Sequence, residues 1–136
     1  MKTHHLLRAA SVLTLLLAAG HTLGGKNSWS PAGDLDVLHA MRNTSFSALG
    51  FTRTLYEFYM GFGWSLSVFL LLQAVVLWQL ASMAKTTPAS TRPMIAAFFV
   101  ATVATGIIAW QMLVPPPVVF NAVIALVLGG AFITAR

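Results

Sequence analysis

Long runs of apolar residues, separated by short polar segments, dominate the pattern of this chain. Residues 58–84 contain no charged side chain, and Glu57 and Lys85 flank them. About 20 apolar residues let a helix cross a bilayer, and only a helix satisfies its own backbone hydrogen bonds in hydrocarbon. The pattern therefore predicts a transmembrane helix over 58–84. Three similar runs predict further spans over 6–25, 94–114 and 118–135.

Proline-containing segments separate the last three predicted spans. Residues 85–93 are polar and contain two prolines, so they predict a short turn. The run Pro115–Pro117 is expected to end the third span, because proline cannot continue the helical hydrogen-bond ladder.

The first apolar run has two interpretations. A basic start, an apolar centre over 11–19 and small residues after it are typical of a cleaved signal peptide. The run continues through 20–25 without a persuasive cleavage site, which favours a retained helix. Both interpretations stay open at this point.

The segment 26–57 is the only long polar stretch and predicts a loop outside the cytoplasm. Ser30–Pro31 is typical of a helix N-cap followed by proline at the first helical position. After it, apolar residues recur at spacings of three and four. This pattern predicts an amphipathic helix over about 32–49 that lies on the membrane or caps the bundle and ends at Gly50.

Composition supports a membrane protein. The chain is 57% hydrophobic and 8% charged, whereas soluble domains average about 25% charged residues. A water-soluble fold of 136 residues would leave too much of this apolar surface exposed. We therefore expect one membrane domain, an all-α bundle of four transmembrane helices with an amphipathic helix in the first loop.

Charge and cysteine content exclude several functions. The net charge is +5, but the basic residues are scattered at helix ends and form no basic face. This argues against nucleic-acid binding and favours contact with anionic lipids. The chain has no cysteine, which excludes disulfides and thiol chemistry. No metal-binding motif is found in the sequence, and we expect no metal.

The distribution of lysine and arginine predicts the orientation, because cytoplasmic loops carry an excess of both. With the N-terminus inside, the cytoplasmic side would hold Lys2, Arg8, Lys85, Arg92 and Arg136, and the other side only Lys26, Arg42 and Arg53. We expect a multi-pass protein of the bacterial inner membrane with both termini in the cytoplasm.

His21 and Glu57 are the candidate catalytic pair. His21 lies near the end of the first span and Glu57 at the start of the second, so both belong at similar depth near the outer face. Ionisable groups at that depth are costly unless they are paired or hydrated, and they often mark functional sites. A carboxylate that orients an imidazole suits proton exchange. The alternative is that both groups are hydrated at the interface or tie two helices together.

Aromatic and basic residues surround the same level. Tyr56, Tyr59 and Trp64 are candidates to line a pocket for a lipid or a quinone. Arg53 is a candidate to neutralise a phosphate or to pair with Glu57. The alternative for the aromatic residues is an ordinary interfacial belt. Arg53 is otherwise a cation at the end of a loop.

Several segments of the first 80 residues carry a resemblance: Gly20–Gly24, Trp29, Ala40–Arg42, Gly50–Thr54, Phe58–Gly63 and Leu77–Leu80. They resemble a family of small bacterial four-helix membrane proteins without an established activity. The start Leu6–Arg8 and the four spans are more loosely similar to the DoxX-like group, some members of which associate with quinone-linked redox systems. The resemblance implies a four-helix membrane fold and no particular mechanism.

Together these features predict a small integral membrane protein that binds a lipid-like or quinone-like molecule, or a membrane partner, at its outer face. His21, Arg53, Glu57 and Tyr59 would line the site. A membrane enzyme that uses His21 and Glu57 on a lipid-soluble substrate is the alternative, and a small proton-coupled transporter is a third. Membrane lipids are the expected partners, together with a membrane protein or a second copy of the chain.

Overall fold

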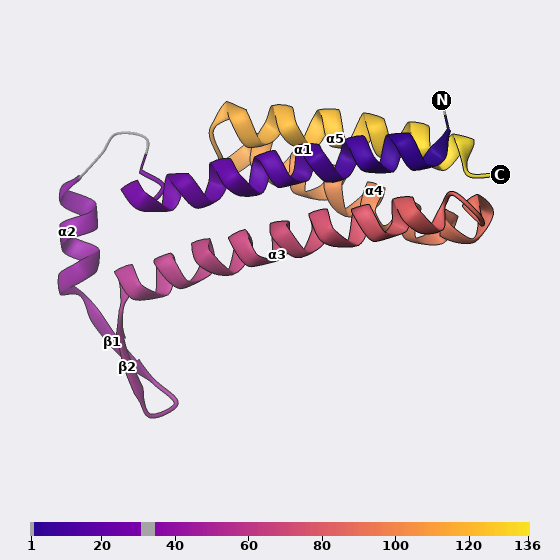
Figure 1. The fold of residues 1–136 in the computed structure, drawn as a ribbon. Helices are drawn as coiled ribbons and strands as arrows, with labels where there is room; N and C mark the ends of the chain where they lie inside the picture. The colour runs from indigo at the N-terminus through magenta and orange to yellow at the C-terminus, as the bar shows by residue number, and fades with distance from the viewer. Residues whose placement is uncertain (1, 31–34) are drawn as a thin grey trace. The chain divides into compact units, whose positions relative to one another are not determined.

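The computed structural model describes residues 2–30 and 35–136, which are mostly α-helical (Figure 1). In chain order the elements are α1 (Thr3–Gly24), a 3₁₀ helix (Gly25–Asn27), α2 (Asp36–Asn43), β1 (Ser45–Ala48), β2 (Phe51–Thr54), α3 (Leu55–Met83), α4 (Pro88–Met112) and α5 (Pro115–Thr134). Within the described residues, four helices are long and apolar enough to cross a membrane, namely α1, α3, α4 and α5. The predicted all-α fold with four spans is confirmed.

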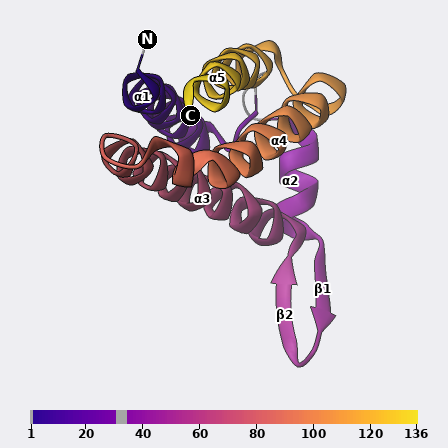
Figure 2. The same cartoon turned by 90° about the vertical axis from the view of Figure 1, so that its right-hand side faces the viewer.

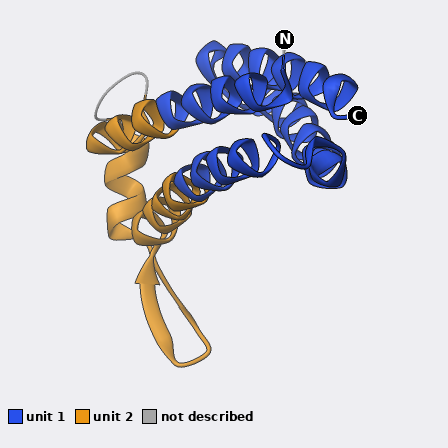
Figure 3. Cartoon of the chain, turned by 45° about the vertical axis from the view of Figure 1, so that its right-hand side comes forward, with its two compact units in different colours: residues 1–17, 70–136 blue, residues 18–69 orange. Residues whose placement is uncertain are grey.

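The chain divides into two compact units (Figure 3). Unit 1 comprises residues 1–17 and 70–136, and unit 2 comprises residues 18–69. Unit 1 therefore holds the beginning of α1, the end of α3 and all of α4 and α5. Unit 2 holds the end of α1, the loop elements and the beginning of α3.

The core of unit 1 consists of buried aliphatic side chains from all four spanning helices. α1, α3 and α5 contribute residues three or four apart, the spacing that places side chains on one helix face. The core includes Leu7 and Ala10 of α1, Leu77, Leu80 and Ala81 of α3, Ile95 of α4, and Ile124, Leu128 and Ala131 of α5. α4 and α5 are consecutive in the chain and pack against each other (Figure 2).

The other faces of these helices are apolar and exposed. Leu126 of α5 and Trp110 of α4 are each 77% exposed, and Leu16 of α1 is 54% exposed. Soluble proteins rarely expose large contiguous apolar surfaces. Hydrocarbon is the solvent that suits this surface.

Hydroxyl groups join helices within unit 1. Ser11 Oγ on α1 donates to the carbonyl of Ala74 on α3 at 2.7 Å. Thr3 Oγ1 donates to Thr134 Oγ1 of α5 at 3.1 Å. Interhelical hydrogen bonds of this kind stabilise membrane helix pairs by about 0.6 kcal/mol on average.

The last two long helices begin before the spans predicted from residues 94 and 118, because proline begins both helices. α4 begins at Pro88, inside the predicted turn 85–93, and α5 begins at Pro115, inside the predicted break Pro115–Pro117. Proline suits the first helical position, where its missing N–H has no helical partner to lose. Pro93 lies inside α4 and removes one hydrogen bond close to the start of that helix.

The first loop also differs from its predicted form. The amphipathic helix exists as α2, but it ends at Asn43, and the residues predicted to continue it to 49 form the hairpin β1–β2. Gly50 is at φ 82° and Leu49 at φ 51°, as in the two-residue turn of a tight hairpin, so Gly50 does not end a helix. The predicted N-cap at Ser30–Pro31 and the helix start at 32 fall partly outside the described residues.

Candidate functional site

α1 is followed by a tight turn with unusual backbone angles. Ser28 has φ 53° and Trp29 has φ 51°, in the left-handed region that few residues other than glycine adopt. The N–H of Trp29 donates to the carbonyl of Gly24 at 3.0 Å, and the N–H of Ser28 donates to that of Gly25 at 3.1 Å. These bonds satisfy carbonyls at the end of the helix that lack a helical partner.

The turn folds the indole of Trp29 back onto α1 and α3. Its Nε1 donates to the carbonyl oxygen of His21 at 2.7 Å, and its ring centre lies 5.0 Å from the imidazole of His21. The indole also meets Trp64 at 5.3 Å and Tyr59 at 6.3 Å between ring centres, both edge to face. We call His21, Trp29, Tyr59 and Trp64 the Trp29 cluster.

Two glycines make room for this indole. A Cβ on Gly63 of α3 would overlap the six-membered ring of Trp29. A Cβ on Gly25 would lie 2.9 Å from the same ring. Both positions therefore depend on the absence of a side chain.

Two tyrosines of α3 hold the turn from the other side. The hydroxyl of Tyr59 donates to the carbonyl of Ser28 at 2.9 Å, and the hydroxyl of Tyr56 lies 2.8 Å from Ser28 Oγ. The guanidinium of Arg42, at the end of α2, lies 4.6 Å from the centre of the Tyr56 ring. Tyr56 thus connects α2, the turn and α3.

His21 has a polar partner on α3. Its Nδ1 lies 3.0 Å from Oγ of Ser67, a side chain that is only 8% exposed. This hydrogen bond joins α1 to α3 inside unit 2, as Ser11 and Ala74 do inside unit 1. His21 therefore ties two helices together, which is one of the alternatives that the sequence left open.

Glu57 caps α3. Its Oε2 accepts the backbone N–H of Thr54 at 2.8 Å, and Thr54 Oγ1 accepts the N–H of Glu57 at 3.1 Å. This reciprocal pair is the capping box of a Thr-x-x-Glu sequence. Ser67, the partner of His21, lies almost three helical turns further on, about 15 Å along the axis. The structure therefore gives His21 and Glu57 different partners at different levels of α3.

Arg53 and Glu57 line an open groove in unit 2 that has a volume of about 320 Å³. Arg53 donates to the carbonyl of Thr52 at 2.9 Å, and its guanidinium lies 5.9 Å from the centre of the Phe51 ring. Beyond the two charged residues, the lining comes from Phe58, Gly61, Phe62 and Ser65. We call this hollow the α3 groove.

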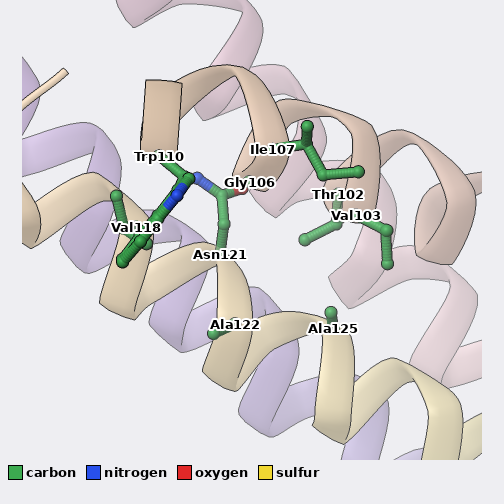
Figure 4. A pocket seen from close by; sticks show the side chains of 9 residues that line it. All are labelled: Thr102, Val103, Gly106, Ile107, Trp110, Val118, Asn121, Ala122 and Ala125. Carbon is green, nitrogen blue, oxygen red and sulfur yellow. The ribbon is translucent and has the colours of Figure 1, made fainter. Parts of the chain in front are cut away.

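A second hollow, of about 260 Å³, lies between α4 and α5 (Figure 4). Asn121 of α5 reaches toward Gly106 of α4, and its amide donates to the carbonyl of Pro117 at 2.8 Å. Thr102 supplies a buried hydroxyl without a hydrogen-bond partner in the described part of the chain. None of the six candidate residues lines this hollow.

The structure thus sorts the candidate residues into two groups. His21, Tyr59 and Trp64 gather around Trp29, and Tyr56 joins them through Ser28, whereas Arg53 and Glu57 lie at the α3 groove. Sequence reasoning gave Trp29 no structural role and did not find the cap of Thr54. The Thr-x-x-Glu motif ahead of an apolar run was a signal for that cap. Within residues 2–30 and 35–136, no cluster of side chains is arranged to hold a metal ion.

The four spanning helices and their exposed apolar faces define a multi-pass membrane protein. Comparisons with protein-family models, curated proteins and solved structures find no match to this chain. The resemblance to small bacterial four-helix membrane proteins, and to the DoxX-like group, therefore stays a prediction.

The seating of Trp29 on Gly63 can be tested with two alanine substitutions two residues apart. Gly63→Ala should lower the free energy of unfolding by about 1–3 kcal/mol, because the methyl group overlaps the indole. Gly61→Ala is the matched control, since nothing lies within 4 Å of a Cβ there. Unfolding by dodecyl sulfate, followed by circular dichroism, measures both. Equal stability of the two variants would contradict the close packing.

Two substitutions separate the contribution of the Glu57 helix cap to stability from that of its negative charge. Glu57→Leu should cost about 1 kcal/mol, as the loss of other helix caps does. Glu57→Gln should retain most of the stability, because glutamine also serves in a capping box. The same unfolding titration compares the variants. A loss as large in Glu57→Gln as in Glu57→Leu would show that the negative charge, and not the cap, is what α3 requires.

Proposed function

We propose that this protein is a non-enzymatic integral membrane protein that binds a phospholipid in the α3 groove. The observation that carries the proposal is the combination of Arg53 and Glu57 with an otherwise largely apolar lining. The volume of about 320 Å³ falls at the small end of ligand pockets, which span roughly 300–1,000 Å³. One headgroup region and part of one alkyl chain suit a groove of this size.

The two charges favour a zwitterionic headgroup. A guanidinium carries five N–H donors in a planar fork that suits phosphate, and one donor of Arg53 goes to Thr52. The exposed carboxylate of Glu57 supplies a negative charge to the same groove. An aminophospholipid offers the matching pair, a phosphate for Arg53 and an ammonium group for Glu57.

The rest of the lining suits an alkyl chain. Gly61 and Ser65 lie four residues apart and therefore on one face of α3, where their small side chains leave a trough. The rings of Phe58 and Phe62 stand beside it, 4.9 Å apart between their centres. Since α3 is a candidate span, a lipid already in the bilayer would reach this trough without crossing water.

Binding has more support than acid–base catalysis. Proton exchange between two side chains requires them within hydrogen-bond reach of each other or of one bridging group. Here His21 bonds Ser67, while Glu57 caps α3 at Thr54. A quinone remains an alternative ligand for the same groove, and the next experiment distinguishes it.

The test is native mass spectrometry of the protein in mild detergent, with extraction and identification of bound molecules. The wild-type chain should retain about one aminophospholipid per protein, as expected for a single groove of this volume. Gly61→Leu should lose it by filling the trough, and Arg53→Gln should lose it by removing the phosphate ligand. Gly20→Leu is the matched control, because it adds the same side chain on α1 where nothing lies within 4 Å.

Two outcomes would contradict this proposal. The first is bulk phospholipid that is unaffected by Gly61→Leu and Arg53→Gln. The second is a stoichiometric quinone in place of the aminophospholipid, which would keep the groove but change the ligand. Either outcome is read against Gly20→Leu, so general damage to the protein is not mistaken for loss of a site.

We further propose that the protein lies in the bacterial cytoplasmic membrane with both termini in the cytoplasm. The excess of lysine and arginine at the predicted cytoplasmic side supports this orientation. Because the native chain has no cysteine, single cysteines can report the topology. In intact cells, Ser47→Cys should react with a membrane-impermeant maleimide, and Ser90→Cys should react only after the cells are opened. The reverse pattern would invert the topology.

A further inference from the structure

The hairpin β1–β2 is amphipathic. In its register Phe46 pairs with Arg53 and Ala48 with Phe51, whereas Ser45 pairs with Thr54 and Ser47 with Thr52. Directly opposed residues share one face of a two-stranded sheet, and alternate residues along a strand point to opposite faces. One face therefore carries only hydroxyl groups, from Ser45, Ser47, Thr52 and Thr54. The other carries two phenylalanines, an alanine and Arg53.

The apolar side of this hairpin is exposed. Leu49, at the turn, is 98% exposed, and Phe51 beside it is 66% exposed. By contrast, the hydroxyl face has polar partners of its own, since Ser47 Oγ lies 2.9 Å from Thr52 Oγ1. An isolated two-stranded hairpin is marginally stable in water at best. We therefore expect another surface to cover the apolar face of the hairpin and to shield it from water.

The apolar face continues onto α3. The ring of Phe46 lies 5.5 Å from that of Phe58, and Phe58 lies 4.9 Å from Phe62, both edge to face. Phe58 and Phe62 belong to a helix long and apolar enough to span a bilayer, and they are 53% and 65% exposed. The solvent that covers these two rings thus also reaches the apolar face of the hairpin.

The direction of the hairpin fits a membrane surface. Within unit 2, the hairpin extends across the axis of the beginning of α3 and not along it (Figures 1 and 2). A segment that leaves a spanning helix in this direction lies close to the plane of the bilayer. The contact between Phe46 and Phe58, one turn into α3, places the phenylalanine face of the hairpin next to this candidate span.

We propose that the hairpin is a membrane-interfacial element that rests in the outer headgroup region of the bilayer that the helices cross. Leu49 and Phe51 enter the boundary of the acyl chains, as apolar side chains of interfacial helices do. Arg53, on the same face, extends its charged end to lipid phosphates while its alkyl stem stays on the apolar side. The partner is a lipid surface. This assignment rests on the continuity between the apolar face of the hairpin and the exposed phenylalanines of α3, and on Arg53, the single cation on that face.

This proposal does not depend on the α3 groove. Leu49 and Phe51 do not line that groove, so their burial in lipid and the capture of a phospholipid are separate observables. Arg53 is common to both proposals and is therefore left unchanged in the test.

The experiment attaches an environment-sensitive fluorophore to single cysteines in the full-length protein. Phe51→Cys reports the apolar face and Leu49→Cys the exposed turn beside it, and Ser47→Cys and Thr52→Cys are matched controls on the hydroxyl face of the two strands. The proteins are reconstituted in vesicles of phosphatidylethanolamine and phosphatidylglycerol. Quenching by nitroxide-labelled lipids and by aqueous iodide is then compared at each position.

Labels at 49 and 51 should emit at shorter wavelength and be quenched by the nitroxide lipids but little by iodide. Labels at 47 and 52 should show the opposite preference. Equal access of iodide to all four positions would overturn the proposal. So would protection of 49 and 51 from both quenchers, because a protein partner or a second copy of the chain would then cover the face.

Discussion

Hydrocarbon offers the peptide backbone no hydrogen-bond partner. The helical form of the described spans follows from that constraint. Within the spans, hydroxyl and amide side chains bond carbonyls of their own helix, as Thr14 does with Ala10 and Asn121 with Pro117. The ends of helices need other partners. At the end of α1 the indole N–H of Trp29 reaches the carbonyl of His21, and at the start of α3 the side chain of Glu57 takes the N–H of Thr54.

Hydrogen bonds near the helix ends also involve the two ionisable candidates. A histidine and a glutamate near the ends of two consecutive spans look like a functional pair when only depth is considered. Each instead has a local structural partner, Ser67 for the imidazole and Thr54 for the carboxylate. The capping bond uses one carboxylate oxygen of Glu57, so its charge still contributes to the groove that it lines with Arg53.

The sequence predicts the spans well and their surroundings poorly, for physical reasons that differ by element. Run length and hydropathy suffice for four helices, because the bilayer fixes both. The starts of α4 and α5 were not predicted, because proline was interpreted there as a helix breaker and not as a first helical residue. In the loop, apolar residues at spacings of three and four favoured the prediction of a helix over the alternation of side chains between two faces in 45–54. The tight turn at Leu49 and Gly50 reverses the chain there.

The packing of Trp29 was beyond prediction from pattern alone. It requires left-handed backbone angles at Ser28 and Trp29, and neither position has the glycine that would indicate such angles in a sequence. It also requires a glycine about 34 residues later, whose missing side chain leaves space for the indole. The level of the predicted site was informative nonetheless, since His21, Tyr59 and Trp64 meet at this indole. The depth of a residue along its span limits which other residues it can contact. The backbone turn at Ser28 and Trp29 determines which of these contacts form.

The beginning of α3 presents two faces with different uses. One face points toward α1 and the turn that contains Ser28 and Trp29. Its residues recur at spacings of three and four, namely Tyr56, Tyr59, Gly63 and Ser67. Phe58, Gly61, Phe62 and Ser65 lie on the other side and line the groove. The first face packs against the indole of Trp29. Its contacts join the beginning of α3, which also carries the second face, to α1 and the turn. The missing side chain of glycine matters differently on the two faces, since a Cβ at Gly63 would overlap Trp29, whereas a Cβ at Gly61 would meet no atom within 4 Å.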